Sequence, residues 1–285
     1  MSAELEKIRI EIDSTDRQLV ELLNRRAELV LKVKEAKAKG KIDVYSPARE
    51  RQIIERVREL AEGGSFPKAA LERIFVSVVS ATRSLIGEVK LGCLGPEGSL
   101  CFEAAKKQFG EDVLFSFRSD IDELFRLVES GELDFAVIPF DMAGGVSEET
   151  LGRFIGADIR IVAEVLVRND SSQLLGTDGK TFARFVVIGA KEPPASGKDR
   201  TSLLCAGDNH SGALRELLEA FSRFGVTIDR LESKKIAALS PSTVFFLEFS
   251  RHVSDEQLQL ALAELKSRSS YYRLLGSYPQ AAHSY

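Results

Sequence analysis

Two cations recur on one face of the first predicted helix. Arg26 interrupts an apolar stripe that runs from Leu5 to Ala36, and Lys37 follows it eleven residues later. At about 100° per residue, these two side chains lie within about 20° of each other around the helix. A charge that faces inward needs a partner, and an arginine holds a carboxylate through two parallel hydrogen bonds. The spacing therefore predicts a site for a small substrate that carries carboxylates. The alternative is that both cations are solvated or pair with acidic residues of the same helix, at Glu11, Glu28 and Glu35.

Further polar residues in the other predicted helices are candidates for the same site. Arg49 and Glu50 lie at the start of the second helix, in the stretch ARERQ, and Thr82 ends an apolar run in the third. Arg9 lies on the first helix but is rotated from Arg26 by roughly 100°. An antiparallel second copy of the chain would bring Arg9 into the same cavity.

Three helices must position these residues. The apolar pattern of residues 5–39 continues without an internal glycine or proline, which predicts one helix on the order of 50 Å long. Such a helix cannot bury its stripe against itself, so it needs other helices or a second copy of the chain. Pro47 suits the first turn of a second helix, and residues 66–89 read as a third. We therefore expect residues 1–90 to form an all-helical domain.

The pattern changes after residue 90. Short apolar strands alternate with helices up to about residue 190, which predicts a small α/β domain over residues 91–190. After the stretch KEPPASGKD, residues 198–280 follow the order strand, helix, strand, strand, helix, strand. That order is typical of a split βαβ sandwich of the ferredoxin-like type.

Composition excludes several classes of function. The chain has 285 residues, a formal net charge of -4 and a sequence pI near 5.7, so it has no general electrostatic reason to bind nucleic acid or an anionic membrane. No segment has the unbroken apolar length of a membrane span. The three cysteines form no CxxC pair, which favours reduced thiols without zinc. We expect a cytoplasmic protein with no metal and no cofactor.

The helical part resembles a known family. The segments IRIEIDSTDRQLVELLNRRAELVLKVKEAK, YSPARE and LERIFVSVVSATRSLI are similar to those of the all-helical chorismate mutases. The resemblance implies an intertwined homodimer in which Arg9 reaches into the partner's site. It also implies roles for the other five residues: Arg26 and Arg49 hold substrate carboxylates, Lys37 faces the breaking ether oxygen, and Glu50 and Thr82 bind the hydroxyl and carboxylate ends.

The implied reaction explains this set of charges. Chorismate becomes prephenate by an intramolecular rearrangement, so neither a nucleophile nor a cofactor is required. The protein must compress a flexible dianion into its reactive conformer and stabilise the charge that grows on the ether oxygen. Two positions depart from the family pattern, because Ser46 replaces an Asp and Ile86 replaces the Gln or Glu that donates to the ether oxygen. The loss of one such donor typically costs about a hundredfold or more in rate.

The middle part resembles prephenate dehydratase in three segments, LGPEGSLCFEAA, DFAVIPFDMAGGVSEET and TFARFVVIG. The second segment has Asp141, Met142 and Ala143 where the family has Glu-Asn-Ser, and the third has Ala183 in place of a threonine. Between Glu164 and Phe182 there is no room for the second lobe that completes the dehydratase cleft. We interpret this part as a truncated remnant of a dehydratase lobe whose glycine turn at residues 95–99 is structural.

The C-terminal part resembles the ACT regulatory domain in the stretches NHSGALRELLEAFSRFGVTIDRLESKKI and LLGSYP. The resemblance implies a phenylalanine effector bound by Asn209, Gly212, Ala213, Leu214, Glu232 and Ser233. Lys234 and Lys235 replace the family's Arg-Pro pair. A dimerisation module that binds nothing is the alternative.

The order of the three parts matches the bifunctional P-proteins of phenylalanine biosynthesis. Our first hypothesis is a chorismate mutase that responds to phenylalanine through the ACT domain. The second is the full bifunctional enzyme, which makes phenylpyruvate, and the third is a catalytically silent phenylalanine sensor.

Overall fold

The computed structural model describes residues 3–37, 44–142, 145–168, 182–208, 210–236, 239 and 243–281. Its N-terminal part consists of three helices, α1 (Ala3–Lys37), α2 (Pro47–Leu60) and α3 (Lys68–Ser84). The single long helix and the start of α2 at Pro47 are confirmed. The third predicted helix was too long, because the chain turns at Leu85 and Ile86, where the Ile86 amide bonds to the Arg83 carbonyl at 2.8 Å.

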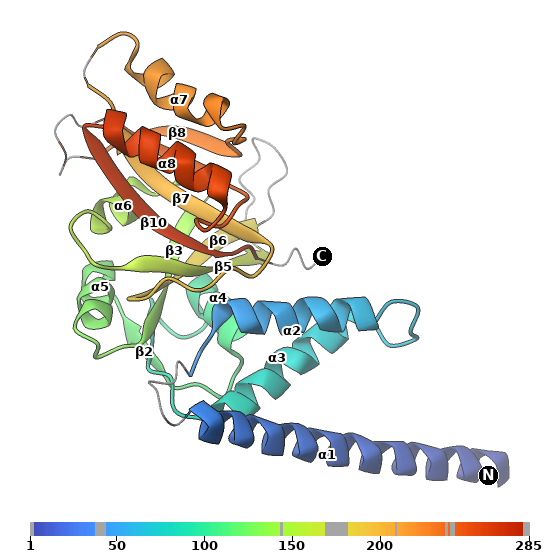
Figure 1. Ribbon diagram of the computed structural model, residues 1–285. Helices are drawn as coiled ribbons and strands as arrows, with labels where there is room; N and C mark the ends of the chain where they lie inside the picture. The colour runs from blue at the N-terminus through green and yellow to red at the C-terminus, as the bar shows by residue number, and fades with distance from the viewer. Residues whose placement is uncertain are drawn as a thin grey trace, which may run out of the picture.

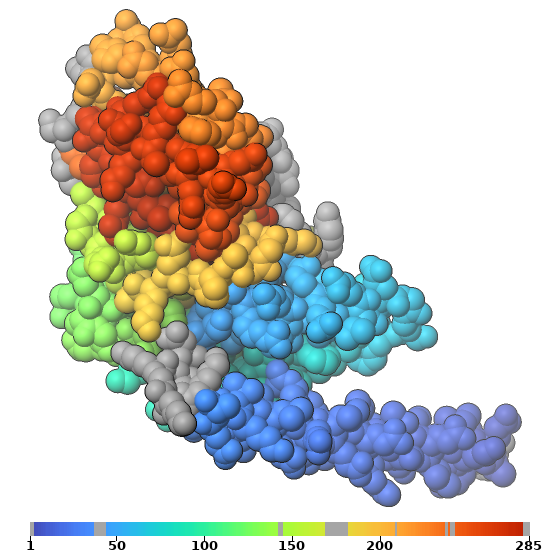
Figure 2. All heavy atoms as spheres, in the orientation of Figure 1, coloured from blue at the N-terminus to red at the C-terminus, as the bar shows by residue number. Residues whose placement is uncertain are grey.

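Helix α1 contacts α3 at one end only. It projects as an arm from the rest of the molecule (Figures 1 and 2). Its large apolar side chains are between 40% and 66% exposed, namely Leu5, Ile8, Ile10, Ile12, Leu19, Val20, Leu22, Leu23, Leu29, Leu31 and Val33. A stripe of this size is unusual on the surface of a monomer.

The middle part forms a six-stranded mixed sheet. The strands are β1 (Leu91–Leu94), β2 (Phe115–Arg118), β3 (Phe135–Met142), β4 (Gly145–Val146), β5 (Arg160–Arg168) and β6 (Phe182–Gly189). Their order is β2-β1-β3-β6-β5, with β4 on β3. The first three strands are parallel, whereas β6 runs antiparallel to both β3 and β5. The helices are α4 (Leu100–Phe109), α5 (Ile121–Glu129) and α6 (Glu148–Arg153).

The C-terminal part has the predicted order βαββαβ. Its strands are β7 (Asp199–Ala206), β8 (Arg230–Lys235), β9 (Thr243–Phe249) and β10 (Tyr271–Pro279). They form an antiparallel sheet in the order β10-β7-β9-β8. Helices α7 (Ala213–Arg223) and α8 (Glu256–Arg268) cover its outer face (Figure 1). Their apolar side chains form a core with Leu203, Leu247 and Phe249.

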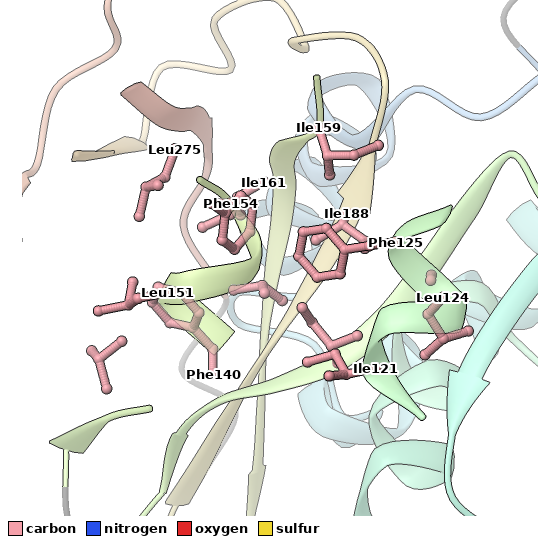
Figure 3. Close-up of a cluster of buried hydrophobic side chains, with 14 of the residues drawn as sticks. Ile121, Leu124, Phe125, Phe140, Leu151, Phe154, Ile159, Ile161, Ile188 and Leu275 are labelled. Carbon is pink, nitrogen blue, oxygen red and sulfur yellow. The ribbon is translucent and has the colours of Figure 1, made fainter. Parts of the chain in front are cut away.

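The two sheets share one hydrophobic core. Ile161 and Ile188 of the first sheet belong to the same buried cluster as Phe246 and Leu275 of the second. Helices α5 and α6 contribute further side chains to this cluster (Figure 3). The opposite face of the first sheet packs on α4 and on Tyr45, which precedes α2. The molecule is therefore layered, from the helical part through both sheets to α7 and α8.

Within the described residues, no helix combines the length and apolarity needed to cross a bilayer. The same residues contain no group of three or more His, Cys, Asp or Glu side chains arranged to hold a metal ion.

The backbones of the two sheets approach each other closely at Gly276 of β10. A Cβ atom at this position would lie 2.2 Å from the carbonyl oxygen of Ile161 on β5. We expect Gly276→Ala to lower the free energy of unfolding by about 1–3 kcal/mol, because the two backbones would have to separate. Urea unfolding measures the change, and Gly64→Ala in the α2–α3 turn, where the nearest atom is 3.6 Å away, is the control. Equal midpoints for the two variants would contradict the packing described here.

Candidate functional site

Arg26 is half-buried where α1 meets α3. Its guanidinium donates to the Thr82 hydroxyl and, at 3.4 Å, to the carbonyl of Val78. Both partners are on α3, so Arg26 does not pair with the acidic residues of its own helix. Burial lowers the pKa of Arg26, as does the charge of Arg49, while Glu50 opposes the change. Charged residues in the first turn of α2, Arg49 and Glu50, therefore act electrostatically on Arg26 of α1.

Glu50 occupies this first turn, next to the exposed Arg49. Its carboxylate oxygen Oε1 lies 2.5 Å from Nη1 of Arg83. Burial raises the pKa of Glu50, whereas the charges of Arg83 and Arg26 act in the opposite direction. The junction of the three helices thus gathers four of the predicted residues, Arg26, Arg49, Glu50 and Thr82.

Two predicted residues are not brought to this junction within one chain. Arg9 is exposed, 3.8 Å from Glu6, and seventeen residues separate it from Arg26, which is about 25 Å along a helix. Lys37 ends α1, and its side chain lies outside the described part of the structure. An arginine from a second chain could reach the junction where Arg9 of the same chain cannot.

Sequence reasoning missed two cations near the junction. Arg83 follows Thr82 directly and is only 5% exposed, an unusual burial for arginine that an apolar run ending in Thr-Arg could have signalled. Lys34 lies eight residues after Arg26 and donates to the Leu85 carbonyl at 3.0 Å. Lys34 therefore places an ammonium group beside Ile86, the position where the family's usual donor is absent.

The turn before α4 has its own hydrogen-bond partners. The hydroxyl of Ser99 caps this helix and accepts from the Phe102 amide at 3.2 Å, while Gly95 has a φ of 93° that favours glycine. Cys101 is buried against Cys93, with their sulfur atoms 3.6 Å apart. The hydrogen bond from Cys93 and burial both raise the pKa of the Cys101 thiol, which makes it a poor nucleophile. These contacts are consistent with the interpretation that the glycine turn at residues 95–99 is structural.

Arg184, next to Ala183 in the third dehydratase-like segment, is buried between the two sheets. Its guanidinium contacts Glu164 of β5 at 2.8 Å and Glu248 of β9 at 2.6 Å. It also donates to the hydroxyl of Tyr278 at 2.8 Å. Burial favours the neutral form of Glu248, but the charge and hydrogen bond of Arg184, together with the charge of Arg200 and a hydrogen bond from Ser202, hold the pKa of Glu248 below its ordinary value. Arg184 thus contacts two carboxylates and a phenol within the protein.

We expect Arg184→Met to destabilise the protein by up to about 3–5 kcal/mol at pH 7, because Glu164 and Glu248 lose their buried cation and keep the longer contacts of Arg200, at 3.3 Å from each carboxylate. The ordinary pKa of Glu248 is 4.5, and its folded pKa is lower. Its contribution is therefore present above pH 4.5 and lost as the pH falls through the folded pKa. The difference between wild type and variant should shrink toward acidic pH, since the Glu248 carboxylate of the variant can protonate.

Urea unfolding between about pH 4 and 7 measures this difference. Arg223→Met, which breaks an exposed ion pair with Glu264, is the control and should cost less than about 1 kcal/mol. A loss at Arg184 that does not change with pH would contradict the ion-pair account.

The residues predicted to bind an effector lie in two places. Gly212 precedes α7, and Ala213 and Leu214 are in its first turn, all three partly buried. Glu232 lies on β8, where it pairs with Arg230 and, at 2.7 Å, with Lys234. Ser233, also on β8, is exposed. Asn209 lies outside the described residues. Arg230 also contacts Asp141 of β3, so this strand is tied to the middle sheet.

A cavity of about 640 Å³ lies where α2 and α3 face α4 and β5. Glu50 and Arg51 line it, but Arg26 and Thr82 are not among its lining residues. The predicted substrate residues are therefore not all gathered around this cavity.

Two family models match the chain. Residues 8–86 match chorismate mutase type II, and residues 91–192 match prephenate dehydratase. Among curated relatives, the bifunctional chorismate mutase/prephenate dehydratase of Aquifex aeolicus is 27% identical, and the match covers 98% of each chain. The corresponding protein of Pseudomonas aeruginosa is 26% identical with the same coverage.

Solved structures match the middle and C-terminal parts. The prephenate dehydratase of Streptococcus mutans is 27% identical with a TM-score of 0.57, covering 68% of this chain and 100% of that chain. The prephenate dehydratase of Arthrobacter aurescens in complex with L-Phe has a TM-score of 0.58 at 20% identity, covering 67% of this chain and 90% of that chain. The second likeness concerns the fold alone.

The alignment with the Aquifex relative also shows a difference in length. The covered 98% of the 285 residues are about 279, so about 77 of the 356 aligned positions contain no residue of this chain. A segment of that total size would be enough for a small lobe.

Proposed function

The chain belongs to the family of bifunctional chorismate mutase/prephenate dehydratases, and on this premise we propose that its activity is that of a chorismate mutase alone. It is an isomerase that converts chorismate to prephenate in aromatic amino-acid biosynthesis. The observation that carries the proposal is the junction of α1, α2 and α3, where Arg26, Arg49, Glu50 and Thr82 meet.

The charges at the junction suit this substrate. Arg26 and Arg49 would hold the two carboxylates of chorismate, which compresses the dianion into its reactive conformer. Glu50 would accept a hydrogen bond from the substrate hydroxyl, and Thr82 would bind a carboxylate end. Lys37 would face the ether oxygen, where fixed positive charge stabilises the transition state. Lys34, beside Ile86, adds positive charge at the position of the missing donor.

A homodimer would complete the site. The apolar stripe of α1 is exposed in a single chain. The α1 helix of a second copy has the same length and the same apolar stripe, so the two helices could bury each other's apolar side chains. An antiparallel partner helix would carry Arg9 from its far end to the junction of the first chain. The active form we propose therefore has two equivalent sites, each built from both chains.

We propose that the C-terminal sheet is an ACT domain that binds phenylalanine. Its βαββαβ order and the L-Phe complex of the Arthrobacter relative support this assignment. In this chain Glu232 already pairs with Arg230 and Lys234, so an effector ammonium group would compete with two cations for it. A dimerisation module that binds no ligand is the alternative.

Three observations argue against a second activity as a dehydratase. Ala183 lacks the hydroxyl of the family threonine, and the adjacent Arg184 is engaged by Glu164 and Glu248. The alignment with the Aquifex protein contains about 77 positions without a residue of this chain, and we propose that they include the second lobe of the cleft. We retain two alternatives: the full bifunctional enzyme, and a silent phenylalanine sensor, which the loss of the donor at Ile86 favours.

The direct test is to add chorismate to the purified protein and follow the loss of its absorbance together with the formation of prephenate. We expect turnover, and we expect Ile86→Gln to raise kcat by about tenfold or more, because it restores a donor to the developing oxyanion. Absence of turnover in both proteins, together with measurable phenylalanine binding, would assign the protein to the sensor class.

The shared site can be tested by complementation. Arg9→Ala and Arg26→Ala should each lower kcat/KM by about a hundredfold or more. In a mixed dimer one site carries both substitutions and the other carries neither, so co-expressing the two variants should restore about a quarter of the wild-type activity. The distribution of tagged and untagged chains measures the dimer fraction. Co-purified mixed dimers that remain as inactive as the parents would contradict a site built from both chains.

A further inference from the structure

Arg83 links the mutase junction to the α/β lobe. It lies in the last turn of α3 and is 5% exposed. One amino group, Nη1, is 2.5 Å from Oε1 of Glu50 on α2. The other, Nη2, donates to the backbone carbonyl of Phe109, the last residue of α4. A single guanidinium therefore joins two helices of the mutase part to a helix of the lobe.

The surroundings of Arg83 fix its orientation. Its guanidinium carbon lies 5.5 Å from the ring centres of both Tyr45 and Phe109, distances at which aromatic faces attract a cation. The carbonyl of Phe109 is at the negative end of the α4 dipole and has no partner within its own helix. Ser80 adds a longer contact at 3.5 Å. These contacts hold the part of the guanidinium that does not bind Glu50.

Arg83 holds only one oxygen of the Glu50 carboxylate. Among the described residues, Oε2 of Glu50 accepts no hydrogen bond, whereas Oε1 is bound by Arg83. Arg58 on α2 differs, because it engages both oxygens of Glu72, at 2.6 and 2.8 Å, and leaves neither available. The arrangement at Glu50 fixes the carboxylate and keeps one acceptor oxygen for another donor.

We infer that Arg83 is a positioning residue of the mutase site, which holds Glu50 so that Oε2 can accept the substrate hydroxyl, and that the end of α4 supports Arg83 in this role. The inference rests on the proposed mutase function. It also gives the α/β lobe a purpose without chemistry of its own, because the lobe supplies the carbonyl and a ring that orient Arg83.

The charged groups that face Glu50 allow the inference to be tested by pH. They are Arg83 from α3 and Arg26 from α1. The buried phenol of Tyr45, which precedes α2, also faces Glu50, but burial raises its pKa and keeps it neutral. Glu50 must be ionised to accept a hydrogen bond on both oxygens, and Arg83 helps to keep it so. Without Arg83 the pKa of Glu50 rises, and the acidic limb of the kcat/KM profile moves to higher pH.

The first experiment compares Arg83→Met, Arg83→Lys and the control Arg58→Met in the full-length protein. We expect Arg83→Met to lower kcat/KM about tenfold to a hundredfold and to move the acidic limb up by about one pH unit or more. Arg83→Lys keeps the charge, so its limb should stay near that of the wild type while kcat/KM recovers in part. Arg58→Met should leave both unchanged. An unshifted limb in Arg83→Met, or equal losses in Arg83→Met and Arg58→Met, would overturn the inference.

The support from α4 has its own matched pair of variants. A Cβ atom at Gly110, directly after α4, would lie 2.5 Å from Cβ of Ser80 on α3, so Gly110→Ala should push α4 away from Arg83. Gly131 follows α5 with a similar φ, 77° against 79°, but has no atom within 4 Å. We expect Gly110→Ala to lower kcat/KM severalfold more than Gly131→Ala. Equal kcat/KM values in these two variants would overturn the role of α4.

A measurement without substrate separates this inference from the proposed function. ¹³C NMR of carboxyl-labelled glutamate, with Glu50 assigned through Glu50→Gln, follows its titration in wild type and Arg83→Met. A higher pKa in the variant supports the hold of Arg83 on Glu50 even if the wild type fails to turn over chorismate, an outcome that would overturn the proposed function alone. Equal pKa values would overturn the inference whatever the activity.

Discussion

The buried ion pairs of Arg184 with Glu164 and Glu248 unite the two sheets of this protein. Isolated, each of these charges would carry a large desolvation penalty, so the three must remain together. Around them, side chains from both sheets form one continuous apolar core. The middle and C-terminal parts therefore form a single layered body. Arg184, which belongs to the dehydratase-like sequence, connects its two sheets.

This body supports the helical part, which makes few contacts of its own. Helix α1 touches α3 at one end and leaves an apolar stripe uncovered. Tyr45, which precedes α2, and Arg83 of α3 contact the α/β lobe, and Glu55 of α2 pairs with Lys198 of the C-terminal part at 3.2 Å. The mutase site we propose therefore depends on two parts outside the helices of one chain, a second chain and the α/β lobe. In this proposal a second chain supplies Arg9, and the lobe orients Arg83, which in turn holds Glu50.

The sequence predicted the elements well because their signals are local. The period of α1, Pro47 at the start of α2 and the βαββαβ order each depend on neighbouring residues. The proximity of Arg26 to Thr82, 56 residues away, was inferred through family resemblance. The role of Arg83 was missed because its partners come from three separate elements, Glu50 on α2, the end of α4 and the segment before α2. Likewise, nothing near Arg184 in the sequence identifies Glu248, whose contact arises only when the sheets pack together.

We propose that the protein has a single activity, in its helical part, and that the α/β lobe is a support rather than a second catalyst. Incubation of the purified protein with prephenate, followed by an assay for phenylpyruvate against a protein-free control at the same pH, tests this most directly. We expect phenylpyruvate to form no faster than in the control. Phenylpyruvate formation that depends on protein concentration would contradict it and would restore a catalytic role to the lobe.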